Sequence, residues 1–210
     1  MKRIGLLGGS FNPAHAGHRH ISLEAMRLLG LDEVWWLVSP QNPLKPAAGM
    51  APLAVRLASA RAMARHPRIR PLAIEAELGT RYAVDTVAAL KRLRPDVAFI
   101  WLMGADILPE LHRWRRWRRF ARTVPIAVLA RPRYMGAALV SPAMAWLGRW
   151  RRPSGSIRDW ARWPLPAITV LSIRQTPLSA TAIRAADPGW AQQFTPALTG
   201  PVRTGQAFDD

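Results

Sequence analysis

Six short apolar runs recur along the chain, and helix-type patterns separate most of them. Runs of this length, rich in Val, Ile, Leu and Trp, are typical of strands that are buried on both faces. We assign strands to residues 3–7, 34–38, 69–74, 97–103, 124–130 and 167–173. Apolar residues at helical spacing predict helices over residues 16–29, 53–65, 83–94 and 105–120, the last broken near His112, and a short final helix that starts at Ser179.

The alternation of strands and helices predicts an α/β fold with a doubly wound parallel sheet covered on both faces. Such sheets bind ligands beyond the carboxyl ends of their strands, where the strand order reverses. Two stretches interrupt the alternation. Residues 40–52 form a proline-rich loop of the kind that often covers an active site. Residues 134–166 have no clear period, and we interpret them as an insertion packed on the edge of the domain.

The length of 210 residues fits one domain with a full core. The chain has no cysteine, which excludes disulfides, thiolate nucleophiles and cysteine-based zinc sites. No stretch approaches the roughly 18 consecutive apolar residues of a membrane span. The apolar segment near residue 1 is too short for a signal peptide. We therefore expect a globular, cytoplasmic protein.

Basic residues outnumber acidic ones by 30 to 13, which gives a formal net charge of +17. A surplus of this size attracts polyanions, from nucleic acid or an anionic membrane surface to small molecules such as ATP. A solvated, arginine-rich surface explains the same numbers, so charge alone does not choose among these classes.

Residues 8–18 read Gly-Gly-Ser-Phe-Asn-Pro-Ala-His-Ala-Gly-His and follow the first strand directly. The paired glycines permit a positive φ and a close approach of backbone to ligand, and the next residues favour a turn. His15 and His18 lie three residues apart, so a helix that begins near Ala14 places both on one face at its N-terminus. The amides and dipole of that helix favour an anion, and we therefore expect a phosphate site.

The spacing in this segment excludes two familiar phosphate-binding motifs. The chain has no Gly-x-x-x-x-Gly-Lys-Ser/Thr sequence, and its early glycines do not form Gly-x-Gly-x-x-Gly. A phosphate turn with histidines in place of a lysine indicates chemistry at the phosphorus of a nucleotide, without a hydride cofactor.

The sequence His-Ala-Gly-His at residues 15–18 resembles the signature of the His-x-Gly-His nucleotidyltransferases, and within them the nicotinate mononucleotide adenylyltransferases. A second segment, Leu-Ser-Ala-Thr-Ala-Ile-Arg at residues 178–184, resembles the Ile-Ser-Ser/Ala-Thr-x-Ile-Arg motif of that family. The resemblance implies a Rossmann-like nucleotidyltransferase domain over residues 1–187 with a short helical part at its C-terminal end. We expect residues 188–210 to form a loosely ordered tail.

In the family that the chain resembles, the 5′-phosphate of a mononucleotide attacks the α-phosphorus of ATP and pyrophosphate leaves. The resemblance implies ATP and nicotinate mononucleotide as partners, deamido-NAD as product and Mg²⁺ as the ion that accompanies ATP. It implies no obligatory nucleic acid. Because the nucleophile is already an anion, catalysis can come from in-line placement and from neutralisation of the triphosphate charge.

The resemblance also implies which residues meet ATP. His15 and His18 would contact the phosphates, Lys45 would close over the β- and γ-phosphates, and Arg184 would supply a fixed positive charge. These four are the predicted catalytic residues. The other predicted ATP-binding residues are Gly8, Gly9, Ser10, Phe11, Ser179 and Thr181. We expect no metal site built from protein ligands alone.

For the acceptor nucleotide, the resemblance points to a Gly-x-Asp motif at the end of the fourth strand and to an aromatic residue that stacks on the pyridine ring. The predicted acceptor-binding residues are Asn12, Tyr82, Thr86, Gly104, Asp106, Trp114 and Arg131. Trp114 also fits an apolar helix stripe together with Trp117, so a place in the core stays open for it.

The chain departs from the family pattern at three positions. Asn12 stands where most members have aspartate, and either side chain can make the turn. Leu44 replaces a frequent histidine, which weakens the phosphate grip of the loop. Ala83 replaces a threonine that often touches the nicotinate carboxylate, so selection of acid over amide must come from backbone amides, a helix end or a nearby arginine.

Two other functions stay open from the sequence. One is a sister adenylyltransferase that uses nicotinamide mononucleotide or phosphopantetheine. The other is a basic protein that binds nucleic acid or a membrane surface. It is suggested by residues 112–122, where six arginines alternate with aromatic side chains.

Overall fold

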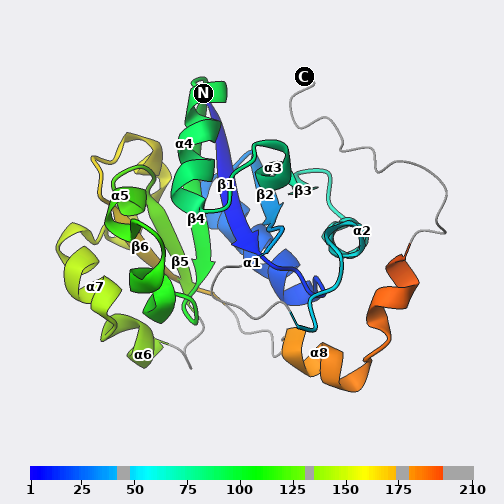
Figure 1. The fold of residues 1–210 in the computed structure, drawn as a ribbon. Coiled ribbons are helices and arrows are strands. Elements are labelled where there is room, and N and C mark those ends of the chain that lie inside the picture. The colour runs from blue at the N-terminus through cyan, green and yellow to red at the C-terminus, as the bar shows by residue number, and fades with distance from the viewer. Residues whose placement is uncertain (42–47, 131–134, 174–179, 196–210) are drawn as a thin grey trace.

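The computed structural model describes residues 1–41, 48–130, 135–173 and 180–195 and contains one six-stranded sheet (Figure 1). All neighbouring strands are parallel, and their order across the sheet is β3-β2-β1-β4-β5-β6. The strands are β1 (Lys2–Gly9), β2 (Glu33–Val38), β3 (Ile69–Leu72), β4 (Val97–Gly104), β5 (Ile126–Ala130) and β6 (Ile168–Ser172). The order reverses between β1 and β4, so the predicted doubly wound sheet is confirmed and its switch point lies beside β1.

Helices cover both faces of this sheet, and each face has its own hydrophobic core. The α-helices are α1 (Ala16–Leu29), α2 (Leu53–Ala64), α3 (Ile74–Glu77), α4 (Ala83–Leu93), α5 (Trp117–Ala121), α6 (Met135–Leu139), α7 (Pro142–Leu147) and α8 (Ala180–Ala186). The 3₁₀ helices are η1 (Leu108–Arg113), η3 (Gly148–Trp150), η4 (Ser154–Arg162) and η5 (Trp190–Phe194). No helix in the described ranges combines the length and apolar character that a membrane crossing requires.

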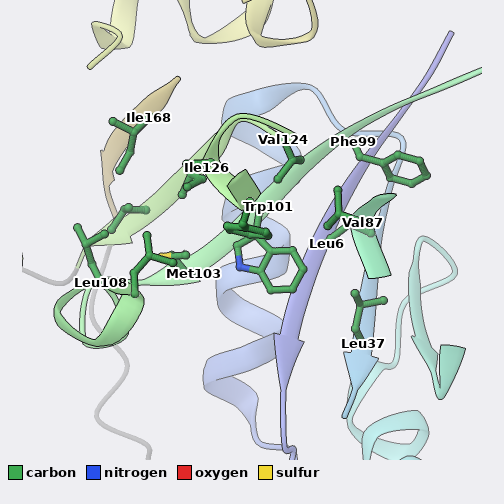
Figure 2. Close-up of a cluster of buried hydrophobic side chains, with 14 of the residues drawn as sticks. Leu6, Leu37, Val87, Phe99, Trp101, Met103, Leu108, Val124, Ile126 and Ile168 are labelled. Atoms are coloured by element: carbon green, nitrogen blue, oxygen red, sulfur yellow. The ribbon is translucent and has the colours of Figure 1, made fainter. Parts of the chain in front are cut away.

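The two cores alternate along each strand because successive side chains point to opposite faces. Figure 2 shows the core under α4, where Leu6, Trp101 and Ile126 from three strands meet Val87 of α4 and Leu108 of η1. The other core packs α1, α2 and η4 against the opposite face of the sheet.

Two of the predicted elements differ from the observed ones. The strand expected over residues 69–74 ends at Leu72, and Ile74 begins the short helix α3 instead. A single buried isoleucine fits the period of a strand and that of a helix equally well, so the hydrophobic pattern could not show to which of the two Ile74 belongs. The helix expected over residues 105–120 is divided into η1 and α5, and the break lies at residues 114–116, where Arg116 has φ of 50°.

The described part of the predicted insertion, residues 135–166, spans the edge of the sheet and contributes to both cores. Leu147 of α7 is buried with the α4 core, and Trp160 of η4 is buried with the α1 core. The indole of Trp160 donates a hydrogen bond to the carbonyl of Leu29 at 2.9 Å, which fastens η4 to the end of α1. Beyond α8, Trp190 of η5 is buried too, and η5 contacts α2.

The conformation of Gly8 differs from the expected one. Gly8 and Gly9 belong to β1, and neither has a positive φ. A Cβ at Gly8 would lie 2.7 Å from the indole of Trp101, so the strand can pack flush against that ring only without a side chain. The left-handed conformation in this segment falls on Phe11, with φ of 47°.

Arg56 of α2 is the buried residue that joins the loops at the carboxyl edge of the sheet. It is 1% exposed, and its guanidinium donates to the carbonyls of Ser10 and Ser39 at 2.7 Å, of Ala51 at 2.8 Å and of Pro40 at 2.9 Å. Burial lowers the pKa of the Arg56 guanidinium, which still stays charged at neutral pH because its ordinary pKa is so high. One planar cation thereby holds the turn after β1 against the segment after β2.

Replacing Arg56 with lysine tests this role. An ammonium group has three donors at one point and cannot match four carbonyls that surround a planar fork, so Arg56→Lys should lose about 2–4 kcal/mol of unfolding free energy. Urea unfolding measures the change. Arg61→Lys, an exposed change on the same helix, is the control and should stay within about 0.5 kcal/mol of the parent. Equal midpoints for Arg56→Lys and the parent would contradict the role.

Candidate active site

A cavity of about 650 Å³ opens at the carboxyl edge of the sheet, beside the ends of β1 and β4. Its wall combines these two strand ends with the first residues of α1, α4 and α8. A cavity of this size at a topological switch point suits a nucleotide-sized ligand. The predicted site residues that line it are Gly8, Gly9, Ser10, Phe11, Asn12, His15, His18, Tyr82, Gly104, Asp106, Trp114 and Thr181.

The two histidines cap the start of α1 reciprocally. His15 is the N-cap, and its Nδ1 accepts a hydrogen bond from the amide of Gly17 at 3.1 Å. The Nδ1 of His18 accepts from the amide of His15 at 3.2 Å. A neutral imidazole whose Nδ1 accepts carries its proton on Nε2. The caps therefore assign both rings the tautomer with an Nε2–H donor, on a helix start that has no acidic residue in its first turn.

Phe11 packs against one of these two imidazoles, that of His18. Its ring is 1% exposed, stacks on Trp36 with centroids 5.1 Å apart, and lies 4.7 Å from the ring of His18. The ring contacts keep Phe11 in its left-handed conformation despite the cost of a positive φ for a residue with a Cβ.

The turn after β1 is also where the distant C-terminal motif meets the N-terminal one. Arg184 of α8 donates from its guanidinium to the carbonyl of Asn12 at 2.6 Å and contacts the hydroxyl of Thr181 at 3.4 Å. Figure 1 shows α8 near the edge toward which the arrowheads of β1 and β4 point. The fold thus brings the two predicted phosphate motifs together across 172 positions.

Asn12 uses both ends of its amide. The Nδ2 donates to the carbonyl of Gly49 at 2.9 Å, and the Oδ1 accepts from the amide of Ala51 at 3.1 Å. An ionised aspartate could accept but not donate. The expected equivalence of Asn and Asp in the turn therefore does not extend to this link with residues 49–51.

At the end of β4, Gly104 and Asp106 form a compact unit. A Cβ at Gly104 would collide with the carboxylate of Asp106, which folds back over the strand end. The glycine is therefore required for the position of the acid, and this contact explains the Gly-x-Asp spacing.

The other end of the cavity is aromatic and cationic. Trp114 is half-buried and meets Trp101 edge-on at 5.9 Å, so it belongs to the core and lines the cavity at once. Tyr82 lies below the guanidinium of Arg115, which is 4.8 Å from its ring centroid. Arg81 and Arg113 line the same end. This composition suits a flat ring that carries negative charge.

Glu75 is a wall residue that the sequence analysis did not identify. It lies on α3, is 7% exposed and lines the cavity beside Tyr82 and Ala83. Burial raises the pKa of the Glu75 carboxyl to about 7, and a hydrogen bond from Thr86 opposes part of the rise. In the sequence Glu75 and Glu77 look alike, and only the packing of α3 makes the first of them buried.

Two other predicted residues, Thr86 and Arg184, are described but do not line the cavity. Thr86 is fully buried behind its wall, with its hydroxyl near Glu75 and Thr80, and Arg184 acts on the turn through Asn12. Lys45, Arg131 and Ser179 fall outside the described residues. Their assigned roles stay predictions.

The arginine-rich stretch over residues 112–122 is divided between two structural tasks. Arg113 and Arg115 line the cavity. Farther along, Trp117 packs edge-on against Trp146 at 5.1 Å, and the guanidinium of Arg118 lies over Trp117. Its aromatic residues are packed against other side chains, whereas binding of unpaired bases uses open ring faces.

Comparison with known proteins identifies the family. A profile of the cytidylyltransferase-like family matches residues 6–186. The chain is 55% identical over 207 residues to a protein of Erythrobacter litoralis, covering 99% of this chain and 91% of the relative. It is 53% identical over 192 residues to one of Parvibaculum lavamentivorans, covering 90% and 94%. Both relatives are named probable nicotinate-nucleotide adenylyltransferase. The chain belongs to the nicotinate-nucleotide adenylyltransferases of the cytidylyltransferase-like family.

Solved structures agree with this adenylyltransferase fold. Two structures of a Plasmodium falciparum nicotinic acid mononucleotide adenylyltransferase, one complexed with NaAD and one with APC, match with TM-scores of 0.63 and 0.61. Each is 15% identical in sequence, and the match covers 88% of this chain and 83% of theirs. The family resemblance drawn from the two motifs is confirmed, and so is the α/β fold.

The raised pKa of Glu75 in this adenylyltransferase predicts a pH-dependent stability. The pKa of Glu75 in the folded protein, about 7, lies above the ordinary value of 4.5. The contribution of protonated Glu75 to the free energy of unfolding is therefore complete below pH 4.5 and is lost as the pH rises through 7. Glu75→Gln should therefore gain stability relative to the parent by about 2–3 kcal/mol between pH 5 and pH 8.

Urea unfolding at the two pH values measures this difference. Glu77→Gln, an exposed change on the same short helix, should show a difference below about 0.5 kcal/mol. A Glu75→Gln effect that is the same at both pH values would show that the folded carboxyl titrates normally.

Proposed function

We propose that the protein transfers the adenylyl group of ATP to nicotinate mononucleotide, giving deamido-NAD and pyrophosphate. The observation that carries the proposal is the division of one cavity into two ends. A histidine-capped helix start lies at one end, and an aromatic, cationic wall lies at the other. The names of the close relatives support the same reaction.

At the first end, the ATP phosphates would meet donors that are already oriented. The caps of α1 leave His15 and His18 with Nε2–H donors, and the amides and dipole of α1 add to the positive potential. Arg184 holds the carbonyl of Asn12 and so brings a positive charge against the same turn. Fixed donors of this kind stabilise the charge that develops on the triphosphate without reorganising in the transition state.

The nucleophile in this reaction needs no general base. The 5′-phosphate of the mononucleotide is an anion at neutral pH, and its attack on the α-phosphorus displaces pyrophosphate. The protein then contributes in-line placement, which a single cavity with both nucleotides in contact can supply. ATP enters as its Mg²⁺ complex, in which the phosphates and water hold the ion. Among the described residues, no three His, Cys, Asp or Glu side chains are grouped so that they could hold a metal ion.

At the second end, the pyridine ring would lie against Trp114, and its carboxylate would face the start of α4. No side chain caps that start within the described residues, so the first amides of an 11-residue helix can face an anion. Arg115 above Tyr82 adds positive charge. These groups can select a ring carboxylate over a carboxamide without a threonine hydroxyl at position 83.

We also assign Lys45 and Ser179 to the ATP phosphates and Arg131 to the acceptor side. These roles rest on the family motifs that the three residues match in the sequence.

The first test supplies the two pyridine mononucleotides in parallel. Pyrophosphate release from Mg²⁺–ATP should be at least about tenfold faster, as kcat/KM, with nicotinate mononucleotide than with nicotinamide mononucleotide, because a fixed cationic surface rejects the neutral amide. Equal use of both acceptors would keep the reaction and reject the acid preference. Release with phosphopantetheine alone would assign a sister activity.

A second test removes single phosphate donors. His18→Ala and Arg184→Ala should each lower kcat by roughly 100- to 1000-fold, because His18 offers a donor to the phosphates and Arg184 brings a fixed positive charge against the same turn. His20→Ala, on the same helix but outside the cavity lining, is the matched control and should keep most of the activity. Near-normal turnover in His18→Ala or in Arg184→Ala, with folding confirmed by circular dichroism, would reject the role of that residue.

A further inference from the structure

Glu75 places a buried acid at the end of the cavity that faces the acceptor. Its side chain lines the cavity with Tyr82, Ala83 and Val84, which are the residues at the start of α4. Its hydrogen bond within the described residues joins its Oε1 to the hydroxyl of Thr86 at 3.3 Å. The acid therefore lies about one helical turn from the amides proposed to hold the acceptor carboxylate.

The hydroxyl of Thr86 connects Glu75 to that helix start. Its Oγ1 lies 3.2 Å from the carbonyl oxygen of Tyr82 and 2.9 Å from the hydroxyl of Thr80, in addition to Glu75. A hydroxyl has one proton to donate. When Glu75 is ionised, Thr86 donates to it and accepts from Thr80. When Glu75 is protonated, it can donate to Thr86, whose own proton then turns to the carbonyl of Tyr82.

The other charges near this end differ from Glu75 in position. Glu77 on the same helix and Asp85 in the first turn of α4 are exposed. Five charged residues also line the cavity: Arg81 in the loop before α4, Asp106 just after β4, Glu110 and Arg113 on η1, and Arg115 in the loop after η1. All five are exposed, so solvent screens their charges more than it screens the charge of Glu75.

We infer that Glu75 is a specificity-determining residue for the charge of the acceptor ring: protonated, it admits a ring carboxylate at the start of α4, and ionised, it disfavours that carboxylate relative to a neutral carboxamide. The inference rests on the proposed function, because it concerns which pyridine mononucleotide that site prefers. Its physical basis is the repulsion of two like charges in a weakly solvated site, which a neutral amide does not feel.

The test is the pH dependence of a ratio. We define the acid preference as kcat/KM for nicotinate mononucleotide divided by kcat/KM for nicotinamide mononucleotide, each measured by pyrophosphate release from pH 6 to pH 8.5. Both acceptors carry the same 5′-phosphate and react with the same ATP, so the titrations of those groups cancel. For the parent enzyme, the preference should fall by about tenfold as the pH rises through 7, the range in which Glu75 loses its proton.

Glu75→Gln should hold the preference at the low-pH value of the parent across the whole range, because a neutral amide replaces the titrating acid. Glu77→Gln should follow the parent curve. A positioning role without charge selection would instead lower both activities of Glu75→Gln together and leave the slope of the ratio unchanged, which would overturn the inference.

The outcomes separate the two proposals. No pyrophosphate release with either acceptor at any pH rejects the proposed function itself. Turnover of both acceptors with a flat ratio in the parent enzyme keeps the function and rejects the role of Glu75, and this measurement needs no variant to fold.

Discussion

The active-site edge of this protein depends on one buried cation. The guanidinium of Arg56 donates to carbonyls in three separate segments, at Ser10, at Ser39 and Pro40, and at Ala51. Each of these segments would otherwise bury a polar carbonyl without a donor, which costs free energy comparable to a lost hydrogen bond. The turn that carries both histidines begins at one of these carbonyls. The geometry of the phosphate end therefore depends on a residue that does not line the cavity.

The histidine pair shows how the same hydrogen bonds serve folding and chemistry. The Nδ1 atoms of His15 and His18 cap α1, and this use leaves the protons on the opposite nitrogens. A carboxylate cap would satisfy the same amides but would bring a negative charge to the proposed phosphate site. A neutral imidazole caps the start of α1 without adding a negative charge, so the cap and the proposed anion site do not conflict.

Much of the architecture was predictable because local signals agreed. The bounds of α1 follow from its apolar stripe, its capping histidine and Gly30 in the left-handed conformation after it. Twelve of the residues that the family motifs marked line the cavity. The missing parts depend on tertiary packing. Arg56 is one of 30 basic residues and Glu75 one of 13 acidic ones, and neither spacing nor composition marks the buried member. The packing contact that requires glycine at position 8 was not predicted, because the ring of Trp101 that presses on it comes from a strand 93 positions later.

The bond between Arg184 and the carbonyl of Asn12 has a consequence for how the site comes into being. The partners are separated by 172 positions, so almost the whole chain must be synthesised and ordered before they can meet. Contacts of such long sequence separation carry a large loop-closure cost and form late. A nascent chain that has completed the first five strands already has its histidine turn but not its arginine. Under the proposed role of Arg184, the capacity to bind a triphosphate arrives with the last part of the domain, and substrate binding reports that α8 has been synthesised and docked.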